Sequence, residues 1–369
     1  NEWSMLCGHR ERRFWVTFGL IRRSVHCMKK GKLFGHLIII VVLLGVLCIG
    51  LGYVVNKKTV INAKSTEAIA DKAFSNNGLI SEYGFDTKSK FLDDQLKAHN
   101  FSGTVLFFDK KTVEFQKPYA NQDFAYRIPN TINTMYPNDN LTLLVNLVLI
   151  DRLVENNELN TNEKISAFNI NDKYRKATLN LFLKQAKNVY KNGTFIISGK
   201  TDLMKVSKYN QYCREIIGSI SSKRYQNVIS ENINKKIGLA SFGTYATYKN
   251  SMNIAQLYET DRKTIQYNSK VKVEQNTVVA TPLSFATFMT ALLNGHFGLT
   301  DHQLNNIRDI FESNQGEINI NYNADHQYMV SSFNSKGDSG YVIMGNYSPA
   351  TSFENLVLKS LGQDTVKEK

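Results

Sequence analysis

An apolar segment from Leu141 to Ile150 constrains the fold of this chain more than any other feature. Asn140 precedes it, and Asn is a favoured N-cap because its side chain accepts a hydrogen bond from a free helical N–H group. The segment is therefore predicted to form a long apolar helix that begins at Leu141. Leu143 adds to the apolar surface of this helix.

The residues on either side of this helix carry a resemblance to a known family. Asn130-Thr131-Ile132-Asn133-Thr134-Met135-Tyr136 precedes the helix and Asp151-Arg152-Leu153-Val154-Glu155 follows it. This resembles the penicillin-recognising serine hydrolases, which include class C β-lactamases, DD-carboxypeptidases and related esterases. In that family N-T-x-D-T-x-F leads to S-x-x-K, an apolar helix and Q-L-V-E. Counting from either flank places the nucleophilic Ser on Asn140 and the catalytic Lys on Leu143.

Three further segments resemble the family in the right order, so that the resemblance covers most of residues 87–362. They are Phe101–Leu106 (F-x-G-x-V-L), Ile216–Leu239 (ending E-N-I-x-K-P-L-G-M) and Thr281–Gly295 (ending A-L-L-N-G). The resemblance implies an α/β fold of the β-lactamase and DD-peptidase type, an antiparallel sheet flanked by helices with a helical subdomain. A shared fold says nothing about activity.

The residue pattern also predicts a sheet assembled from both ends of the domain. We expect a helix over 87–99, a β-hairpin over 103–115, strands over 328–333 and 340–344, and a last helix over 353–361. Thr281-Pro282 and the capping box that begins at Thr300 mark two helix starts between them. Strands at both ends with a helical middle favour helices packed against one sheet.

The chemical motifs of the family are missing. In the family a Ser at a helix start attacks an acyl carbonyl with the help of a Lys one turn later. The carboxamide of Asn140 is not a nucleophile, and Leu143 has no titratable group. The second motif, Y-x-N, falls on Lys205-Val206-Ser207, and the third, K-T-G or H-x-G, falls near Ile320-Asn321-Tyr322. Asn140, Leu143, Lys205 and Ser207 are therefore degenerate positions, and no residue is predicted to be catalytic.

Three residues near the lost motifs remain candidates for the lining of a cleft. Tyr209 and Asn210 follow the second motif closely, and a short gap would bring them into it. His326 is nearest to the third motif, although a lone His at such a place is more often a surface or strand residue. The literal S-x-x-K from Ser269 to Lys272 is interpreted as a chance match, because residues three apart on a strand point to opposite faces.

An unbroken apolar run of 19 residues, Leu37 to Val55, is long enough to span a bilayer. Eight Lys and Arg residues precede it and three follow closely, so the positive-inside rule predicts a cytoplasmic N-terminus and an extracellular C-terminal domain. A cleaved signal peptide is the alternative. The run is long for one and no A-x-A site ends it, which favours an uncleaved signal anchor. Met28 is the expected start, which would make residues 1–27 upstream translated sequence.

The expected organisation is a cytoplasmic basic segment (1–36), a transmembrane helix (37–55), a stalk (56–86), a β-lactamase-like extracellular domain (87–362) and a tail (363–369). Residues 1–58 hold ten Lys and Arg against two Glu, so most of the net charge of +13 lies there and no basic surface for nucleic acid is predicted. Cys213 alone lies beyond the membrane segment, so no internal disulfide is expected. No motif indicates a metal or another cofactor.

These features predict a membrane-anchored, non-catalytic pseudoenzyme on the surface of a Gram-positive type of cell. By resemblance, its ligands would be cell-wall peptides or a partner protein. One alternative is an active carboxypeptidase or esterase type of serine hydrolase with relocated groups, such as Ser207 with Lys205 or Lys208. Another is an architectural protein whose cleft has filled in. An open pocket at the start of the helix near Leu141 would favour binding.

Overall fold

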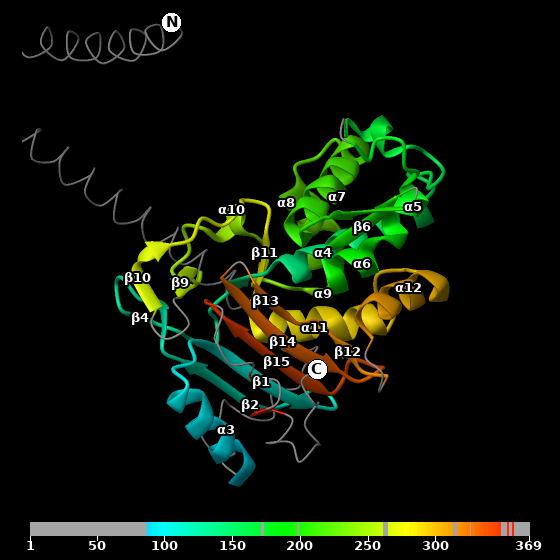
Figure 1. Ribbon diagram of the computed structural model, residues 1–369. Helices are drawn as coiled ribbons and strands as arrows, with labels where there is room; N and C mark the ends of the chain where they lie inside the picture. Colours follow the sequence, from blue (N-terminus) through cyan, green and yellow to red (C-terminus); the bar gives the residue numbers. More distant parts are fainter. Residues whose placement is uncertain are drawn as a thin grey trace, which may run out of the picture. The chain divides into compact units, whose positions relative to one another are not determined.

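A six-stranded antiparallel sheet is the largest sheet in the described part of the computed structural model (Figure 1). The structure describes residues 87–347, except 171–172, 198, 261–264, 313–315 and 325, together with Phe353, Leu356 and Val357. The strand order is β12 (Ile318–Asn319), β14 (Gln327–Phe333), β15 (Gly340–Gly345), β1 (Gly103–Asp109) and β2 (Thr112–Tyr119), and β13 (Tyr322–Ala324) also pairs with β14.

The sheet is built from both ends of the domain, as the sequence predicted. Strand β1 lies between its hairpin partner β2 and the C-terminal strand β15, with Val105 opposite Lys117 on one side and Ile343 on the other. The predicted hairpin and both predicted C-terminal strands are confirmed, and so is the first helix, α3 (Thr87–Ala98). The helix predicted over 353–361 lies mostly outside the described residues.

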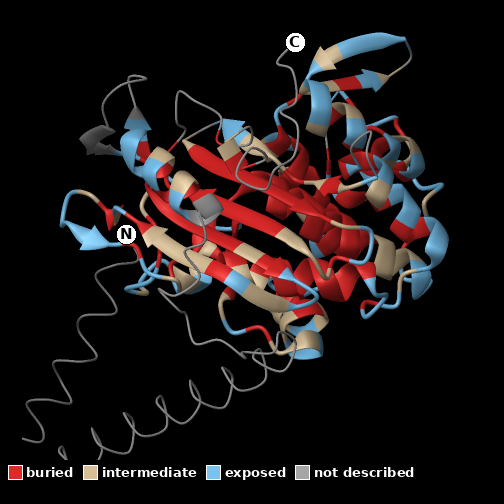
Figure 2. Cartoon of the chain, turned by 90° about the horizontal axis from the view of Figure 1, so that it is seen from below, coloured by how far each residue is buried: buried red, intermediate tan, exposed pale blue. Residues whose placement is uncertain are grey.

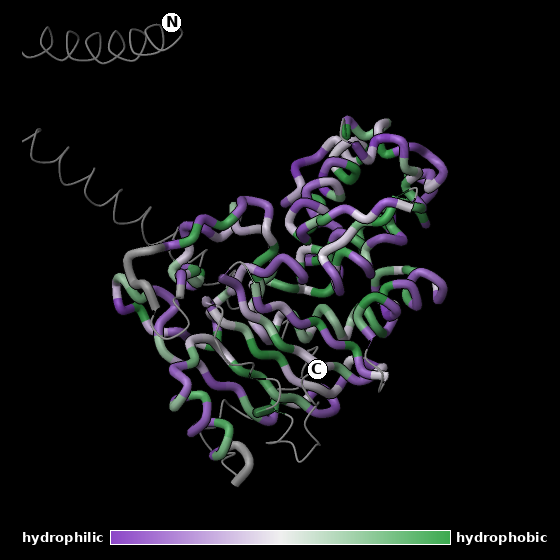
Figure 3. Tube along the Cα trace, in the orientation of Figure 1, coloured by the Kyte–Doolittle hydropathy of each residue, from purple (hydrophilic) through white to green (hydrophobic). Residues whose placement is uncertain are grey.

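Alternation along the strands gives the sheet two buried faces, because successive side chains of a strand point to opposite sides. On one face Val105 and Ile343 pack with Leu92 and Leu96 of α3. On the other face Leu106 belongs to the main core, into which helix α11 (Pro282–Leu293) packs against β1 and β15. Figure 2 shows that several strands of the sheet are largely buried, and Figure 3 shows hydrophobic segments along them.

The remaining elements include a helical region that shares the main core. The helices are α4 (Asp139–Glu155), η2 (Ile165–Phe168), α5 (Leu179–Lys184), α6 (Ala186–Asn192), α7 (Val206–Ser221), α8 (Tyr225–Ile229), η3 (Ser230–Asn234), α9 (Lys235–Ile237), α10 (Tyr245–Tyr248) and α12 (Asp301–Phe311). Small sheets are formed by β5 (Tyr136–Pro137), β11 (Val278–Ala280) and β8 (Phe242–Thr244), by β3 (Asn121–Asp123) with β4 (Ile128–Pro129), by β6 (Thr194–Ile197) with β7 (Lys200–Leu203), and by β9 (Tyr258–Thr260) with β10 (Ile265–Lys270). Helix α4, almost entirely buried along its first twelve residues, packs along α7.

Two helix starts have the local structure that their sequences predicted. The Thr281 side chain accepts a hydrogen bond from the Ser284 N–H group at 3.0 Å, and Pro282 is the first residue of α11. At the start of α12, Thr300 and Gln303 form a reciprocal capping box. Both predictions are confirmed.

None of the helices in the described part of the chain is long and apolar enough to cross a membrane. The predicted transmembrane helix over 37–55 lies outside the described residues. The same holds for the basic segment 1–36, the stalk 56–86 and the tail 363–369.

Candidate functional site

Helix α4 begins two residues earlier than the sequence suggested. The N-cap is Asn138, whose Oδ1 accepts a hydrogen bond from the Leu141 N–H group at 2.9 Å. The prediction that Asn140 caps a helix starting at Leu141 is wrong, because Asn138 has extended backbone angles (φ −151°, ψ 129°) while the helix already includes Asp139. Asn140 therefore lies inside the first turn.

Asn140, at the position of the family's nucleophile, is buried with 2% of its surface exposed. Its Nδ2 donates a hydrogen bond to the carbonyl oxygen of Asn321 at 2.8 Å. Asn321 belongs to the segment where counting placed the third motif, so the first and third motif positions do lie against each other. The Oδ1 atom of Asn140 is buried without a hydrogen-bond partner among the described residues.

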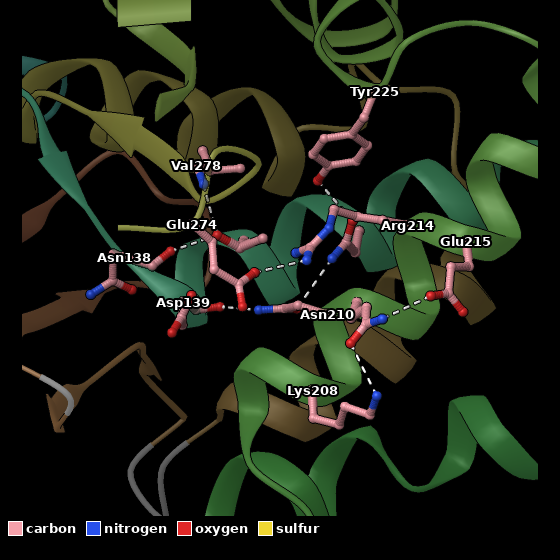
Figure 4. Close-up of polar contacts among 12 residues, drawn as sticks. Asn138, Asp139, Lys208, Asn210, Arg214, Glu215, Tyr225, Glu274 and Val278 are labelled. Atoms are coloured by element: carbon pink, nitrogen blue, oxygen red, sulfur yellow. Dashed lines mark hydrogen bonds and ion pairs between the residues drawn. The ribbon is translucent and has the colours of Figure 1, made fainter. Parts of the chain in front are cut away.

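Two more side chains bind the backbone at the start of α4. The Asp139 N–H group donates to Oε1 of Gln327, in β14, at 2.7 Å. The Asp139 carbonyl accepts from Nδ2 of Asn210, in α7, at 2.8 Å (Figure 4). Gln327 is 6% exposed and Asn210 is fully buried. The start of α4 is thus bonded to the sheet and to α7 by buried carboxamides.

A buried hydrogen-bond chain continues from Asn210 into the core. Nδ2 of Asn146, two turns along α4, donates to Oδ1 of Asn210 at 3.1 Å. The hydroxyl of Tyr225 donates to Oδ1 of Asn146 at 2.7 Å, and the ring projects from α8 toward α7 in Figure 4. Burial raises the pKa of Tyr225 above its ordinary value, which keeps this phenol neutral and able to donate. The chain fixes α4, α7 and α8 relative to one another.

Leu143, at the position of the family's catalytic Lys, is completely buried in the main core. It lies on α4 between Asn140 and Asn146, so an apolar side chain separates two members of the buried polar set. The described residues at this site thus combine carboxamides, a neutral phenol and an aliphatic chain with the buried Asp139 at the start of α4. Such an arrangement supplies hydrogen bonds between elements.

The other candidates from the sequence lie in different surroundings. Tyr209 is fully buried, stacks on Phe182 at 4.4 Å between ring centroids, and donates its hydroxyl to the Phe182 carbonyl at 3.0 Å. Burial raises the pKa of Tyr209 well above its ordinary value. Tyr209 is thus a core residue, whereas its neighbour Asn210 reaches the start of α4. His326 is a partly buried turn residue with φ 65° that precedes Gln327.

The relocated groups considered from the sequence lie at the start of α7. Lys205 precedes α7 as an exposed residue, and Ser207 is partly buried in its first turn. Nζ of Lys208 donates to Oε1 of Gln211 at 3.0 Å and lies 4.7 Å from the centroid of the Tyr212 ring. Both of these contacts of Lys208 are to residues of α7.

Three members of the buried set were not anticipated from the sequence: Asn146, Tyr225 and Gln327. Of these three, only Asn146 could have been found from the sequence. It interrupts an apolar helix, and a buried polar side chain needs a hydrogen-bond partner. Among the described residues, no group of three or more His, Cys, Asp and Glu side chains is placed to hold a metal ion.

Comparison with solved structures defines the class of this fold. The class C β-lactamase of Rhodobacter sphaeroides superimposes with a TM-score of 0.54 at 10% identity, covering 75% of this chain and 98% of that one. Penicillin-binding protein homologues and D-alanine carboxypeptidases superimpose similarly. The domain therefore has the fold of the β-lactamases and penicillin-binding proteins, which confirms the resemblance recognised from its motifs.

A more particular similarity is to proteins of Staphylococcus aureus. FmtA superimposes with a TM-score of 0.59 at 14% identity, covering 82% of this chain and 98% of that one. In sequence, 83 residues are 30% identical to the Staphylococcus aureus teichoic acid D-alanine hydrolase, which is 22% of this chain and 21% of that protein. The sequence match thus spans about a fifth of the curated relative. No family model matches the sequence.

Proposed function

We propose that this chain is a catalytically inactive relative of the penicillin-recognising serine hydrolases and acts as a binding module for cell-wall material. The observation that carries the proposal is the pair Asn140 and Leu143, both neutral and both buried. A carboxamide does not attack an acyl carbonyl at neutral pH, and Leu cannot accept a proton. Removing the nucleophile of a comparable serine enzyme costs on the order of 10⁶ in rate.

The contacts around Asn140 support the same proposal. A nucleophile has to be accessible to its substrate. The side-chain amides of Asn140, Gln327 and Asn210 instead form hydrogen bonds that connect α4 with α7, with β14 and with the segment around Asn321. We infer that the start of α4 has a structural role, in which its hydrogen bonds connect α4 to the sheet and to α7. Binding of cell-wall material is then assigned to other surfaces of the domain.

The class of ligand is proposed from the curated relative. That protein is named a teichoic acid D-alanine hydrolase, and teichoic acids are cell-wall polymers. A chain of related sequence that has lost the nucleophile but kept the fold is expected to retain recognition of such material. The proposed ligand is accordingly a D-alanine-bearing wall polymer or a wall peptide.

Membrane anchoring is part of the proposal and rests on the apolar run Leu37–Val55 with its excess of Lys and Arg on the N-terminal side. Protease added to intact cells is expected to digest the domain that follows residue 60 and to leave a small N-terminal stub, as read on an immunoblot with tags at both ends. Protection of the whole chain would contradict the proposed orientation.

Covalent labelling tests the loss of catalysis. The full chain is expected to form no adduct with a fluorescent penicillin or a fluorophosphonate, and to hydrolyse no chromogenic cephalosporin above the buffer rate. A factor of 10⁶ corresponds to about 8 kcal/mol of barrier at 1.36 kcal/mol per decade, which the remaining contacts cannot supply. An active class C β-lactamase handled in parallel shows that the probes work.

The same experiment can support the alternative function. If a stable adduct forms and mass spectrometry maps it to Ser207 or another Ser, the chain is an active hydrolase with relocated groups. Substituting that Ser by Ala would then have to abolish the labelling. Absence of adduct with every probe excludes an acyl-enzyme mechanism with these acyl and phosphonyl groups and leaves the binding role.

A further inference from the structure

The positive charge of the chain beyond residue 58 is concentrated in one segment, residues 164–208. This segment has ten Lys and Arg against two acidic residues, Asp172 and Asp202. The rest of residues 59–369 has 25 Lys and Arg against 28 Asp and Glu. The net charge of the whole chain therefore conceals a strongly basic segment and a slightly acidic remainder. Acids of the segment itself can neutralise at most two of its ten positive charges.

The basic segment folds into neighbouring elements of the helical region. It comprises η2, α5, α6, the β6–β7 hairpin and the first residues of α7, and α6 contacts α5, β6 and α7 (Figure 1). Oε1 of Gln185, between α5 and α6, accepts a hydrogen bond from the Ile196 N–H group at 3.0 Å, which joins these helices to β6. All ten basic residues of the segment are exposed: Lys164, Lys173, Arg175, Lys176, Lys184, Lys187, Lys191, Lys200, Lys205 and Lys208.

Three of these residues form a stripe along α5 and α6. Lys184, Lys187 and Lys191 are spaced by three and four positions, and residues at that spacing share one face of a helix. Gln185, which separates the two helices, has right-handed helical backbone angles (φ −81°, ψ −9°). The helical period places the buried Phe182 on the opposite side. The stripe is roughly 10 Å long, and its like charges repel one another, so an anionic chain that lies along it relieves that repulsion.

A second group of basic side chains lies over aromatic rings beside β6. Nζ of Lys173 is 5.1 Å from the centroid of the Tyr174 ring, and Nζ of Lys208 is 4.7 Å from that of Tyr212. The two ring centroids are 6.2 Å apart, and Tyr174 also contacts Phe195 of β6 at 4.6 Å. Contacts between the rings thus hold the segment before α5 against α7. The three rings are buried, so the bases of a nucleic acid cannot stack on them.

Two exposed apolar side chains in the same region would suit a different partner, an anionic membrane. Ile196 is 40% exposed and Leu203 is 89% exposed. They lie on one face of the β6–β7 hairpin, because Ile196 pairs with Thr201 and Leu203 pairs with Thr194. Binding to a lipid surface grows with the apolar area that it buries, and two side chains offer little. The positive charges extend over α5, α6 and α7 as well, which favours a long anionic chain.

We propose that the exposed surface of residues 164–208 binds a linear polyanion with a phosphate charge in each repeat, which is the chemistry of a teichoic acid. The inference rests on the proposed function in binding wall material and assigns a surface to it. Lys acts on phosphate as a point charge, and each phosphate that it neutralises releases a counter-ion. An extended set of lysines therefore binds a flexible polymer without a pocket.

Binding of the full chain to purified teichoic acid, measured at several salt concentrations, tests this surface. The triple variant Lys184→Gln, Lys187→Gln and Lys191→Gln should bind about tenfold more weakly, or worse, at about 0.15 M salt. The slope of the logarithm of the binding constant against the logarithm of the salt concentration should become shallower by about 2. The melting temperature should be equal or higher, since repulsion between the three lysines is removed.

The matched control is the triple variant Lys249→Gln, Lys272→Gln and Lys336→Gln. These lysines are exposed and lie outside residues 164–208, and the control removes the same net charge. It should bind teichoic acid as the wild type does. The basic residues within 1–58 are present in every variant, so their contribution to binding does not affect the comparison.

Equal binding by the wild type and the variant at Lys184, Lys187 and Lys191 would overturn the assigned surface and leave the binding of wall material intact. Failure of the wild type to bind teichoic acid would overturn both. Vesicles of anionic phospholipid and single-stranded DNA are titrated in parallel. Tighter binding to vesicles that Leu203→Ser weakens would identify a membrane-docking surface instead. Tighter binding to DNA of equal charge would identify a nucleic-acid surface, and either result would contradict the proposal.

Discussion

The double variant Asn140→Ser with Leu143→Lys is expected to be about 3–5 kcal/mol less stable than the wild type and to show no hydrolase activity. Leu143 is fully buried in the main core, so a Lys there loses packing and places an ammonium among aliphatic groups. The nearby carboxamides of Asn146 and Asn210 already bond to one another and to Tyr225 and Asp139. Restoring two motif residues does not restore the surroundings that activate them.

Chemical denaturation measures the loss of stability, and labelling with a fluorescent penicillin measures activity. Leu143→Met is the matched control, since a swap of similar volume in a core costs less than about 1.5 kcal/mol. A double variant that is as stable as the wild type and becomes labelled would show that the catalytic surroundings survive. That result would contradict the inference that the start of α4 has a structural role and no catalytic one.

Gly103→Ala is expected to cost about 3 kcal/mol or more, or to prevent folding. A Cβ atom at Gly103 would lie 2.0 Å from the carbonyl oxygen of Met344 and 2.8 Å from Cα of Gly345, both backbone atoms of the neighbouring strand. Gly103 pairs with Gly345 on one side and with Tyr119 on the other, so β1 cannot shift without disturbing two ladders. The conflict follows from the close approach of two strands.

Gly218→Ala is the control for this substitution. Gly218 lies in α7, and a Cβ atom there would meet nothing within 4 Å. Ala in a helix is favoured over Gly by about 0.5–1 kcal/mol, so this variant should be slightly more stable. Thermal unfolding of both variants gives the comparison. Equal stability of the two would refute the steric account of Gly103.

Local patterns predicted the sheet and several helices because those patterns act over a few residues. The two strand-like runs within 103–115 placed the hairpin of β1 and β2, and Thr281-Pro282 placed the start of α11. The start of α4 was misplaced for a reason that is not local. Asn138, Asp139 and Asn140 are all good caps, and the choice depends on Val278, whose carbonyl accepts a hydrogen bond from the Asn138 N–H group at 3.0 Å. That bond holds Asn138 in an extended conformation.

The contacts of the candidate site were beyond prediction for the same reason. Gln327 bonds to Asp139 across 188 positions of sequence, and Asn140 bonds to Asn321 across 181. Counting residues along the chain could predict that Asn321 lies near Asn140, because members of the family share the order of their motifs together with the fold. Counting could not predict that carboxamide side chains would form hydrogen bonds around the start of α4. Those bonds depend on the directions of side chains in three different parts of the fold.

The position of β1 between β2 and β15 has a consequence for how this domain comes into being. The central ladder joins Gly103 to Gly345, so the sheet cannot be completed until nearly all of the domain has been synthesised. Contacts between such distant residues make folding slow. Until β15 arrives, the β1–β2 hairpin has an unpaired edge that can associate with other chains.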